Sequence, residues 1–201
     1  MISGKALLLI DIQYDFLEGG ALEVNEASQI VPPILSIAGN FSCIIATQDW
    51  HPPDHKSFAS SHSGKQPYDL IQWKGREEIL WPDHCVQKTK GAEIHPDILA
   101  LNPVLVVKKG ADPETDSYSA FFDNHREQKT PLAGWLAEKK ITELTIAGLA
   151  TDFCVKYSVL DALSLGYSVE VFSAGCRGVN RTPGASEQAL EEMKIAGAEI
   201  R

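Results

Sequence analysis

Several features that would assign this chain to a specialised class of protein are missing from its sequence. The cysteines Cys43, Cys85, Cys154 and Cys176 form no CxxC pair, and they lack the dense spacing of small disulfide-bonded secreted domains. We therefore expect reduced thiols and a cytoplasmic location. A thiol redox function is disfavoured, because no resolving cysteine lies near another cysteine in the sequence.

Basic residues and long apolar runs are also scarce. The chain has 18 Lys and Arg against 27 Asp and Glu, and its scattered basic residues offer no footprint for a phosphate backbone. The early run ALLLI ends in an aspartate and is too short for a secretion signal, and no apolar run reaches membrane length. We expect neither nucleic acid nor a membrane as a partner.

The residues that are present suit one globular domain spanning 1–201. Hydrophobic residues make up 44% and charged residues 22% of the 201 positions, which is ordinary for a folded protein. Short apolar runs typical of buried strands occur at 6–10, 43–47, 104–107, 144–149 and 168–172, with a last run at 198–201. Helical patterns alternate with these runs, which predicts an α/β fold: a three-layer α/β/α arrangement around a mainly parallel sheet of roughly six strands.

Three helices and one long irregular segment complete this prediction. The clearest helix spans 152–165 and stops at Gly166, and the pairs Thr130-Pro131 and Thr182-Pro183 are expected to open two more. The segment at about 50–102 is rich in Pro, His, Ser and Asp and is far longer than an ordinary connection. We expect it to be a functional insertion that binds a metal ion.

Cys154 is a candidate nucleophile because of its place at a strand-to-helix turn. The strand at 144–149 leads directly into the start of the helix at 152–165, where unpaired N–H groups favour a thiolate and can hold an oxyanion. The simpler interpretation is a buried structural thiol, since free cysteine behaves as a small hydrophobic residue. Residues elsewhere in the chain have to distinguish a nucleophile from a structural thiol at this position.

A second cluster of polar residues follows the strand at 43–47. Asp49 and His51 alternate along extended backbone, His55 follows a Pro-Pro turn, and WPDHCV later adds His84. One carboxylate and three imidazoles suit zinc, iron or manganese, and this number of ligands leaves coordination positions open. Each histidine taken alone is more simply a hydrogen-bonded surface side chain, so the metal site rests on the group.

Two further strands end in charged residues. Asp11 follows the strand at 6–10, and Lys108 and Lys109 end the strand at 104–107, so both strands bring charge to the edge where ligands gather in parallel α/β sheets. Taken singly, a helix cap explains the aspartate and a solvated side chain explains either lysine. Because strand side chains alternate, only one of the two lysines can point into a shared site, and the spacing leaves that choice open.

Several ordered motifs across nearly the whole chain resemble the nicotinamidase branch of the isochorismatase-like cysteine hydrolases. They read LLLIDIQYDFLEGGAL, ATQDWHPPDHKSFAS, WPDHCVQ, GAEIHP, KGADPETDSYSAFFD, GLATDFCVKYSVLDAL and GCRGV. The resemblance implies a catalytic trio of Asp11, Lys109 and Cys154, where Lys109 is the lysine that precedes the glycine of the KG step. It further implies one divalent metal ion, zinc, iron or manganese, held by Asp49, His51, His55 and His84.

The same resemblance implies the parts of a substrate pocket. Its lining residues would be Phe16, Trp81, Tyr118 and Ala150. An oxyanion hole would come from the backbone N–H groups of Ala150 and Cys154, and a cis peptide would join Leu149 to Ala150. Phe153 stands where some members carry histidine or tyrosine, which argues against a polar role for that position.

The activity implied by the resemblance is hydrolysis of nicotinamide to nicotinate and ammonia through a thioester, with pyrazinamide as a further substrate. The nearest alternative is a related amidohydrolase acting on a carbamoyl or ureido substrate, and such relatives generally lack the metal ligands. A non-catalytic binding protein with the same fold is the alternative from another class, because fold alone does not dictate function. The oligomeric state is open, since relatives occur both as single chains and as assemblies. A homo-oligomer is therefore one of the expected states.

Overall fold

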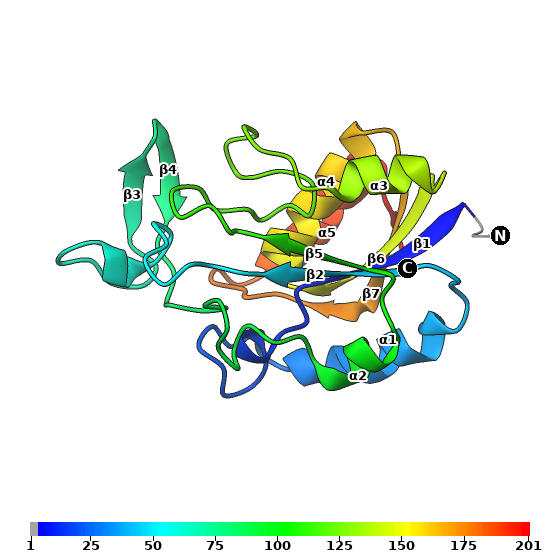
Figure 1. The fold of residues 1–201 in the computed structure, drawn as a ribbon, viewed down its shortest axis with the longest axis horizontal. Coiled ribbons are helices and arrows are strands. Elements are labelled where there is room, and N and C mark those ends of the chain that lie inside the picture. Colours follow the sequence, from blue (N-terminus) through cyan, green and yellow to red (C-terminus); the bar gives the residue numbers. More distant parts are fainter. Residues whose placement is uncertain (1–3) are drawn as a thin grey trace.

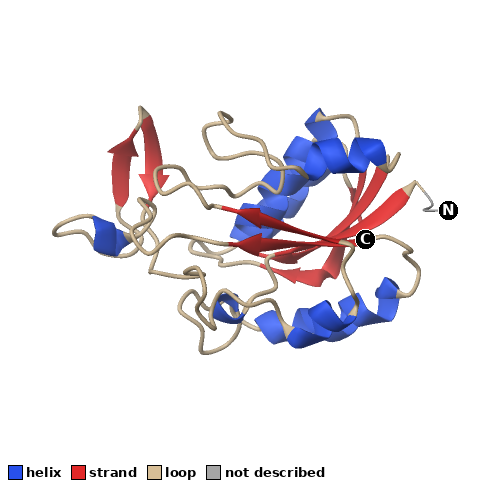
Figure 2. Ribbon diagram, in the orientation of Figure 1, coloured by secondary structure: helices blue, strands red, loops and turns tan. Residues whose placement is uncertain are grey.

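The computed structural model describes residues 4–201, in which a six-stranded sheet lies between two layers of helices (Figures 1 and 2). The strands of this sheet are β1 (Lys5–Ile10), β2 (Ile44–Asp49), β5 (Leu105–Lys109), β6 (Glu143–Leu149), β7 (Ser168–Arg177) and β8 (Glu199–Ile200). Their order is β5-β2-β1-β6-β7-β8, and every adjacent pair is parallel. The predicted three-layer fold with a parallel sheet is confirmed.

Helices cover both faces of this sheet. The pair α1 (Val31–Ala38) and α2 (Pro96–Ala100) lies on one side, and α3 (Leu132–Glu138), α4 (Lys156–Ser164) and α5 (Ala185–Ile195) lie on the other (Figure 1). The central strand β1 is therefore buried on both faces, and the side chains of residues 6–10 are at most 1% exposed. This two-sided burial explains why the strand runs are continuously apolar rather than alternating.

Two helix starts differ from the sequence prediction. The segment Thr151–Val155 forms a π-helical turn before α4 begins, so the first turn of the expected helix at 152–165 is wider than an α-helical one. Helix α5 begins at Ala185, after a turn in which the Ala185 N–H donates to the Thr182 carbonyl at 3.1 Å and Gly184 has a φ of 82°. The start of α3 is as expected, with the Thr130 hydroxyl accepting a hydrogen bond from the Leu132 N–H at 3.2 Å.

The helices α1 and α2 were not predicted from the sequence. Both are short, and both carry proline in the first turn, where the missing N–H would have no partner within the helix. Proline therefore marks the start of the helix in these two segments. Because proline is equally common in loops, the sequence alone does not distinguish the two cases.

The long segment at about 50–102 is more ordered than its composition predicts. It contains a hairpin of β3 (Leu70–Trp73) and β4 (Arg76–Ile79), which projects beyond the carboxyl ends of the parallel strands (Figure 1). The Trp73 indole N–H donates to the Glu114 carbonyl at 2.8 Å, which ties the hairpin to the segment after β5. The hairpin in this segment thus lies at the edge of the sheet where the charged strand ends meet, whereas α2 lies on one face of the sheet.

None of the helices within residues 4–201 is both long enough and apolar enough to cross a membrane.

Candidate active site

Side chains from four strand ends meet at the carboxyl edge of the sheet. Asp11 follows β1, Asp49 ends β2, Lys109 ends β5, and Cys154 lies in the π turn after β6. All four are buried. In the β2–β5 ladder Asp49 stands directly beside Lys109, so strand pairing alone places a carboxylate next to the amine.

The structure brings the predicted trio together around one ammonium group. Lys109 Nζ lies 2.9 Å from Asp11 Oδ2 and 3.5 Å from Cys154 Sγ, and it donates to the Ser117 carbonyl at 2.8 Å. Lys108 instead points out of the site, where its ammonium lies 3.9 Å from the centre of the Trp50 ring. The alternation of the strand therefore sends only Lys109 into the site, as the resemblance implied.

Burial sets the protonation states of this trio. It raises the pKa of the Cys154 thiol well above its usual range, although Lys109 acts in the opposite direction. Burial also raises the pKa of Asp11, although the nearby Lys109 ammonium lowers it. Burial opposes the charge on Lys109, but Asp11 and Asp49 hold its pKa well above the usual range.

These shifts correct one expectation from the sequence. The helix start was expected to favour the thiolate, whereas the structure favours the protonated thiol because desolvation of the sulfur dominates. A base is therefore required for nucleophilic attack. Lys109 contacts two carboxylates, Asp11 at 2.9 Å and Asp49 at 3.1 Å. Asp11 is the better proton acceptor because burial raises its pKa. At Asp49 the effect of burial is outweighed by His51 and Lys109, which lower the pKa of that carboxyl well below its usual range.

Two polar residues that the sequence analysis missed hold Asp11 and Asp49 in place, Thr47 through the Asp11 carboxylate and backbone and Gln13 through the Asp49 backbone. The Thr47 hydroxyl donates to Asp11 Oδ1 at 2.6 Å and accepts from the Asp11 backbone N–H at 3.0 Å. The Gln13 side chain accepts from the Asp49 N–H at 2.7 Å and donates to the Asp49 carbonyl at 2.8 Å. Their only signal in the sequence was a buried-strand context around a polar side chain, and their partners lie 36 positions away.

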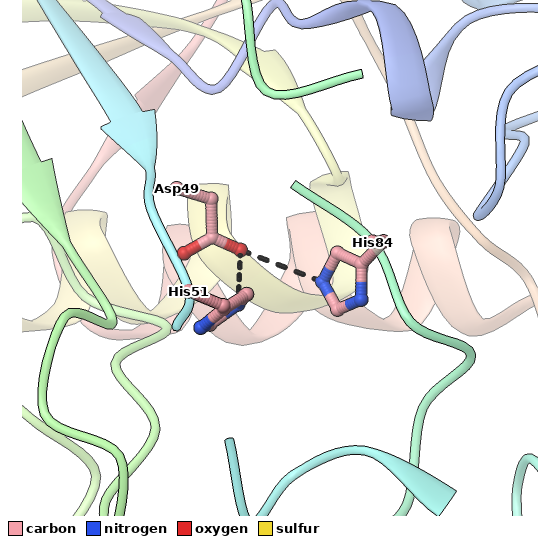
Figure 3. A group of neighbouring side chains, drawn as sticks. All are labelled: Asp49, His51 and His84. Atoms are coloured by element: carbon pink, nitrogen blue, oxygen red, sulfur yellow. Dashed lines mark hydrogen bonds and ion pairs between the residues drawn. The ribbon is translucent and has the colours of Figure 1, made fainter. Parts of the chain in front are cut away.

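Asp49 also belongs to a cluster of imidazoles, which Figure 3 shows around its carboxylate. Its Oδ2 lies 2.9 Å from His51 Nε2 and 3.5 Å from His84 Nε2. His55 lies in a second group with His51 and Asp116, and the ligand atoms within each group are all within 4.8 Å of one another. The four predicted ligands thus fall into two groups that share His51, and Asp116 is a member that the sequence analysis did not single out.

The imidazoles are arranged as metal ligands require. Nδ1 of His51 is 2.8 Å from the Gly110 carbonyl and Nδ1 of His84 is 2.8 Å from the Pro82 carbonyl, which orients each ring and turns both Nε2 atoms toward Asp49 Oδ2, where a cation could bind them together. Nε2 of His55 is buried and has no hydrogen-bond partner among residues 4–201. The donor set of nitrogen and carboxylate oxygen therefore fits a divalent transition metal ion.

The protonation states of the imidazoles in the cluster also fit a bound metal ion. Burial lowers the pKa of His55 to about 4, which keeps this imidazole neutral. Burial opposes protonation of His51 as well, but Asp49 and Asp116 raise its pKa to about 9. Asp49 and Asp116 thus stabilise a positive charge next to His51 Nε2. A metal ion bound there would supply that charge in place of a proton.

Gly110 gives a test of this geometry that leaves every ligand in place. Its φ is 63°, and a Cβ there would lie 2.5 Å from His51 Cε1 and 2.9 Å from Asp49 Oδ1. We expect Gly110→Ala to weaken zinc binding about 10- to 100-fold, because displaced ligand supports have effects of that size. Zinc titration of metal-free protein would measure this effect.

Gly134→Ala is the matched control, since a Cβ at this position in α3 meets nothing within 4 Å. Equal zinc affinity in the two variants would contradict the metal site built around His51 and Asp49.

A small cavity of about 30 Å³ lies between Cys154 and the metal cluster. Its lining contains Cys154, Asp49 and His84 together with all four predicted pocket residues, Phe16, Trp81, Tyr118 and Ala150. Leu22, Asp116, Phe153 and Val179 complete the wall and were not predicted as lining residues. The Trp81 indole N–H donates to the Tyr118 hydroxyl at 3.0 Å, so the aromatic wall is fixed by a hydrogen bond.

The peptide between Leu149 and Ala150 is cis, as the resemblance implied. The Ala150 carbonyl accepts hydrogen bonds from the N–H groups of Phe153 and Val155, both at 3.1 Å, which closes the turn around Cys154. Phe153 packs its ring 4.9 Å from that of Trp81, so this position contributes an apolar wall.

Comparison with known proteins gives matches over the whole chain. The sequence profile of the Isochorismatase domain matches residues 5–201. A nicotinamidase of Escherichia coli (strain K12) is 50% identical over 200 residues, which cover 98% of this chain and 93% of the relative. Two solved structures are similar along their full length.

The first is a nicotinamidase and pyrazinamidase of Acinetobacter baumanii, with a TM-score of 0.94, 40% identity and coverage of 98% of this chain and 95% of the other. The second is a pyrazinamidase of Pyrococcus horikoshii in complex with zinc, with a TM-score of 0.78, 33% identity and coverage of 99% of each chain. Fold, sequence profile and relatives agree, and the chain therefore belongs to the isochorismatase domain family.

Proposed function

We propose that this chain is an amidohydrolase that converts nicotinamide to nicotinate and ammonia, with Cys154 as the nucleophile. The observation that carries the proposal is a single cavity lined by Cys154 and by the carboxylate and imidazole of Asp49 and His84, with Lys109 3.5 Å from the sulfur. Relatives named as nicotinamidases over nearly the full chain support this substrate.

The trio divides the chemistry into acid–base and nucleophilic roles. Asp11 accepts the proton of the thiol, and Cys154 Sγ attacks the carboxamide carbon while the Lys109 ammonium balances the negative charge of the cluster. The tetrahedral intermediate then breaks its C–N bond, the Asp11 proton passes to nitrogen, and ammonia leaves a thioester on Cys154. Water adds to the thioester and releases nicotinate and the free thiol.

The backbone of the π turn would stabilise the oxyanion. Ala150 directly precedes the tight turn and Cys154 lies within it, so their N–H groups are close to the sulfur. The turn itself is closed by the Phe153 and Val155 N–H groups, which both donate to the Ala150 carbonyl. One such donor is worth about 3–4 kcal/mol of transition-state stabilisation.

Asp49, His51, His55 and His84 would hold one divalent metal ion, with Asp116 facing the same cluster. When bound, the ion would supply a coordination position for the pyridine nitrogen of the substrate, which places the carboxamide over Cys154. The zinc complex of the Pyrococcus relative supports zinc, while iron and manganese suit the same donors. Pyrazinamide carries the same ring nitrogen and carboxamide, so we infer that it is a second substrate.

The match of the family profile to residues 5–201 supports one hydrolase domain for the whole chain, with the segment at about 50–102 as its metal-binding insertion. A homo-oligomer is compatible with this domain.

The proposal is tested by incubating the purified protein with nicotinamide and measuring ammonia release. We expect release that is lost after thiol alkylation and lost after chelation, with recovery when zinc is returned. Activity that survives both treatments would contradict the roles of the thiol and the metal. Release from a ureido or carbamoyl substrate, without release from nicotinamide, would favour the alternative amidohydrolase.

His51→Ala separates metal binding from the nucleophile. We expect this variant to lose bound zinc and to raise KM for nicotinamide at least about tenfold, because ligand loss removes the group that orients the ring. Elemental analysis and steady-state kinetics would measure both effects. His62→Ala is the control, since the His62 ring lies outside the cluster, with Nε2 2.9 Å from the Lys56 carbonyl and the ring 5.8 Å from that of Trp73, and the variant should match the unchanged protein.

A further inference from the structure

Asp152 is a buried carboxylate that the proposed mechanism does not use. It lies in the π turn two positions before Cys154 and is 7% exposed. Within residues 4–201 no basic side chain forms an ion pair with it. A buried charge without a cation is costly, so its hydrogen bonds have to compensate.

Both oxygens of this carboxylate bind consecutive backbone amides of a distant segment. Oδ1 accepts from the Val179 N–H at 2.9 Å and Oδ2 accepts from the Asn180 N–H at 2.8 Å. A Cβ on Gly178 would lie 3.0 Å from Asp152 Oδ1 and 1.9 Å from Ser186 Oγ, so glycine permits the close approach of this segment. Successive N–H groups around an anion form a compact and directional cradle.

The segment 178–180 that Asp152 holds also forms part of the cavity wall. The Val179 side chain lines the same cavity as Cys154, Ala150 and Phe153. The Asn180 side chain in turn accepts a hydrogen bond from the Ser186 N–H at 2.9 Å in the first turn of α5. One carboxylate therefore joins the nucleophile turn, a wall of the cavity and the helix behind them.

We propose that Asp152 is a positioning residue, whose carboxylate fixes the Cys154 turn against the segment 178–180 and so sets the place of the sulfur beside Lys109. This inference rests on the proposed hydrolase function. Its consequence is that weakening the two hydrogen bonds should lower the rate of the chemical step more than it lowers substrate affinity. A displacement of about 1 Å at a reacting atom costs on the order of 100-fold in rate.

Asp152→Asn tests this inference with little change in volume, because the amide can accept one of the two N–H groups but not both. We expect kcat for nicotinamide to fall about 10- to 100-fold with KM changed less than about threefold. Asp123→Asn is the matched control: Asp123 is also buried and accepts two backbone N–H groups, from Glu127 at 2.9 Å and Gln128 at 2.8 Å. Its loop lies outside the nucleophile turn, so a general loss of stability would appear in both variants.

Val179→Ala keeps the backbone N–H and trims only the wall, so we expect mainly a change in KM. Unchanged kcat in Asp152→Asn would overturn the inference, as would equal losses of kcat and melting temperature in Asp152→Asn and Asp123→Asn. The rate of Cys154 alkylation by iodoacetamide, followed by mass spectrometry, reads the position of the sulfur without any substrate. A wild-type protein that releases no ammonia would refute the proposed function, while an alkylation rate altered only in Asp152→Asn would still support the positioning role.

Discussion

Cys154→Ala is expected to lower kcat for nicotinamide by about 10⁴- to 10⁶-fold, the range seen when a covalent nucleophile is removed. The loss is large because neither Asp11 nor Lys109 can replace the sulfur that forms the thioester. Ammonia release under saturating nicotinamide would measure the loss. Nicotinamide binding, followed by calorimetry, should persist, because the other lining residues of the cavity and the metal ligands are unchanged.

The control for this experiment is Cys176→Ala. Cys176 is a buried thiol in β7 whose sulfur donates to the Phe172 carbonyl at 3.4 Å, and it is absent from the lining of the cavity. Near-normal turnover by the Cys154 variant would exclude the covalent route. Equal loss in both variants would point to a general effect of removing a core thiol.

Lys109→Met should have the largest effect on stability. Its ammonium lies between two buried carboxylates, 2.9 Å from Asp11 and 3.1 Å from Asp49. Removing the cation leaves these like charges buried and uncompensated, which costs about 3–5 kcal/mol in comparable buried pairs. Urea unfolding would measure the decrease in the free energy of unfolding, and ammonia release should be lost as well.

Two comparisons make this result specific. Lys108→Met removes an exposed ammonium that packs on the Trp50 ring, and we expect a cost of at most about 1 kcal/mol. Adding Asp11→Asn to Lys109→Met removes one of the stranded charges, so stability should recover in part while activity stays absent. A Lys109 variant as stable as the Lys108 variant would contradict the buried charge cluster.

The layers of this protein and several residues that meet at the carboxyl edge of its sheet could be predicted from the sequence. Buried strands are recognisable from their own apolar runs, and helix starts from adjacent threonine and proline, because these signals act between neighbours in the chain. Since parallel strands share one carboxyl edge, the residues that end them could be assigned to one site before any coordinates were known. This reasoning placed Asp11, one of the two lysines Lys108 and Lys109, and Cys154 at one edge of the sheet.

How those residues are held and charged depends on contacts between distant parts of the chain. The supports of Thr47 and Gln13 join positions 36 apart, and the hydrogen bonds from Asp152 reach 27 and 28 positions along the chain. Such contacts depend on the strand order and on loops that pack against each other, which no local pattern records. The protonated state of Cys154 has the same origin, because desolvation depends on everything that surrounds the sulfur and outweighs the helix start that the sequence displays.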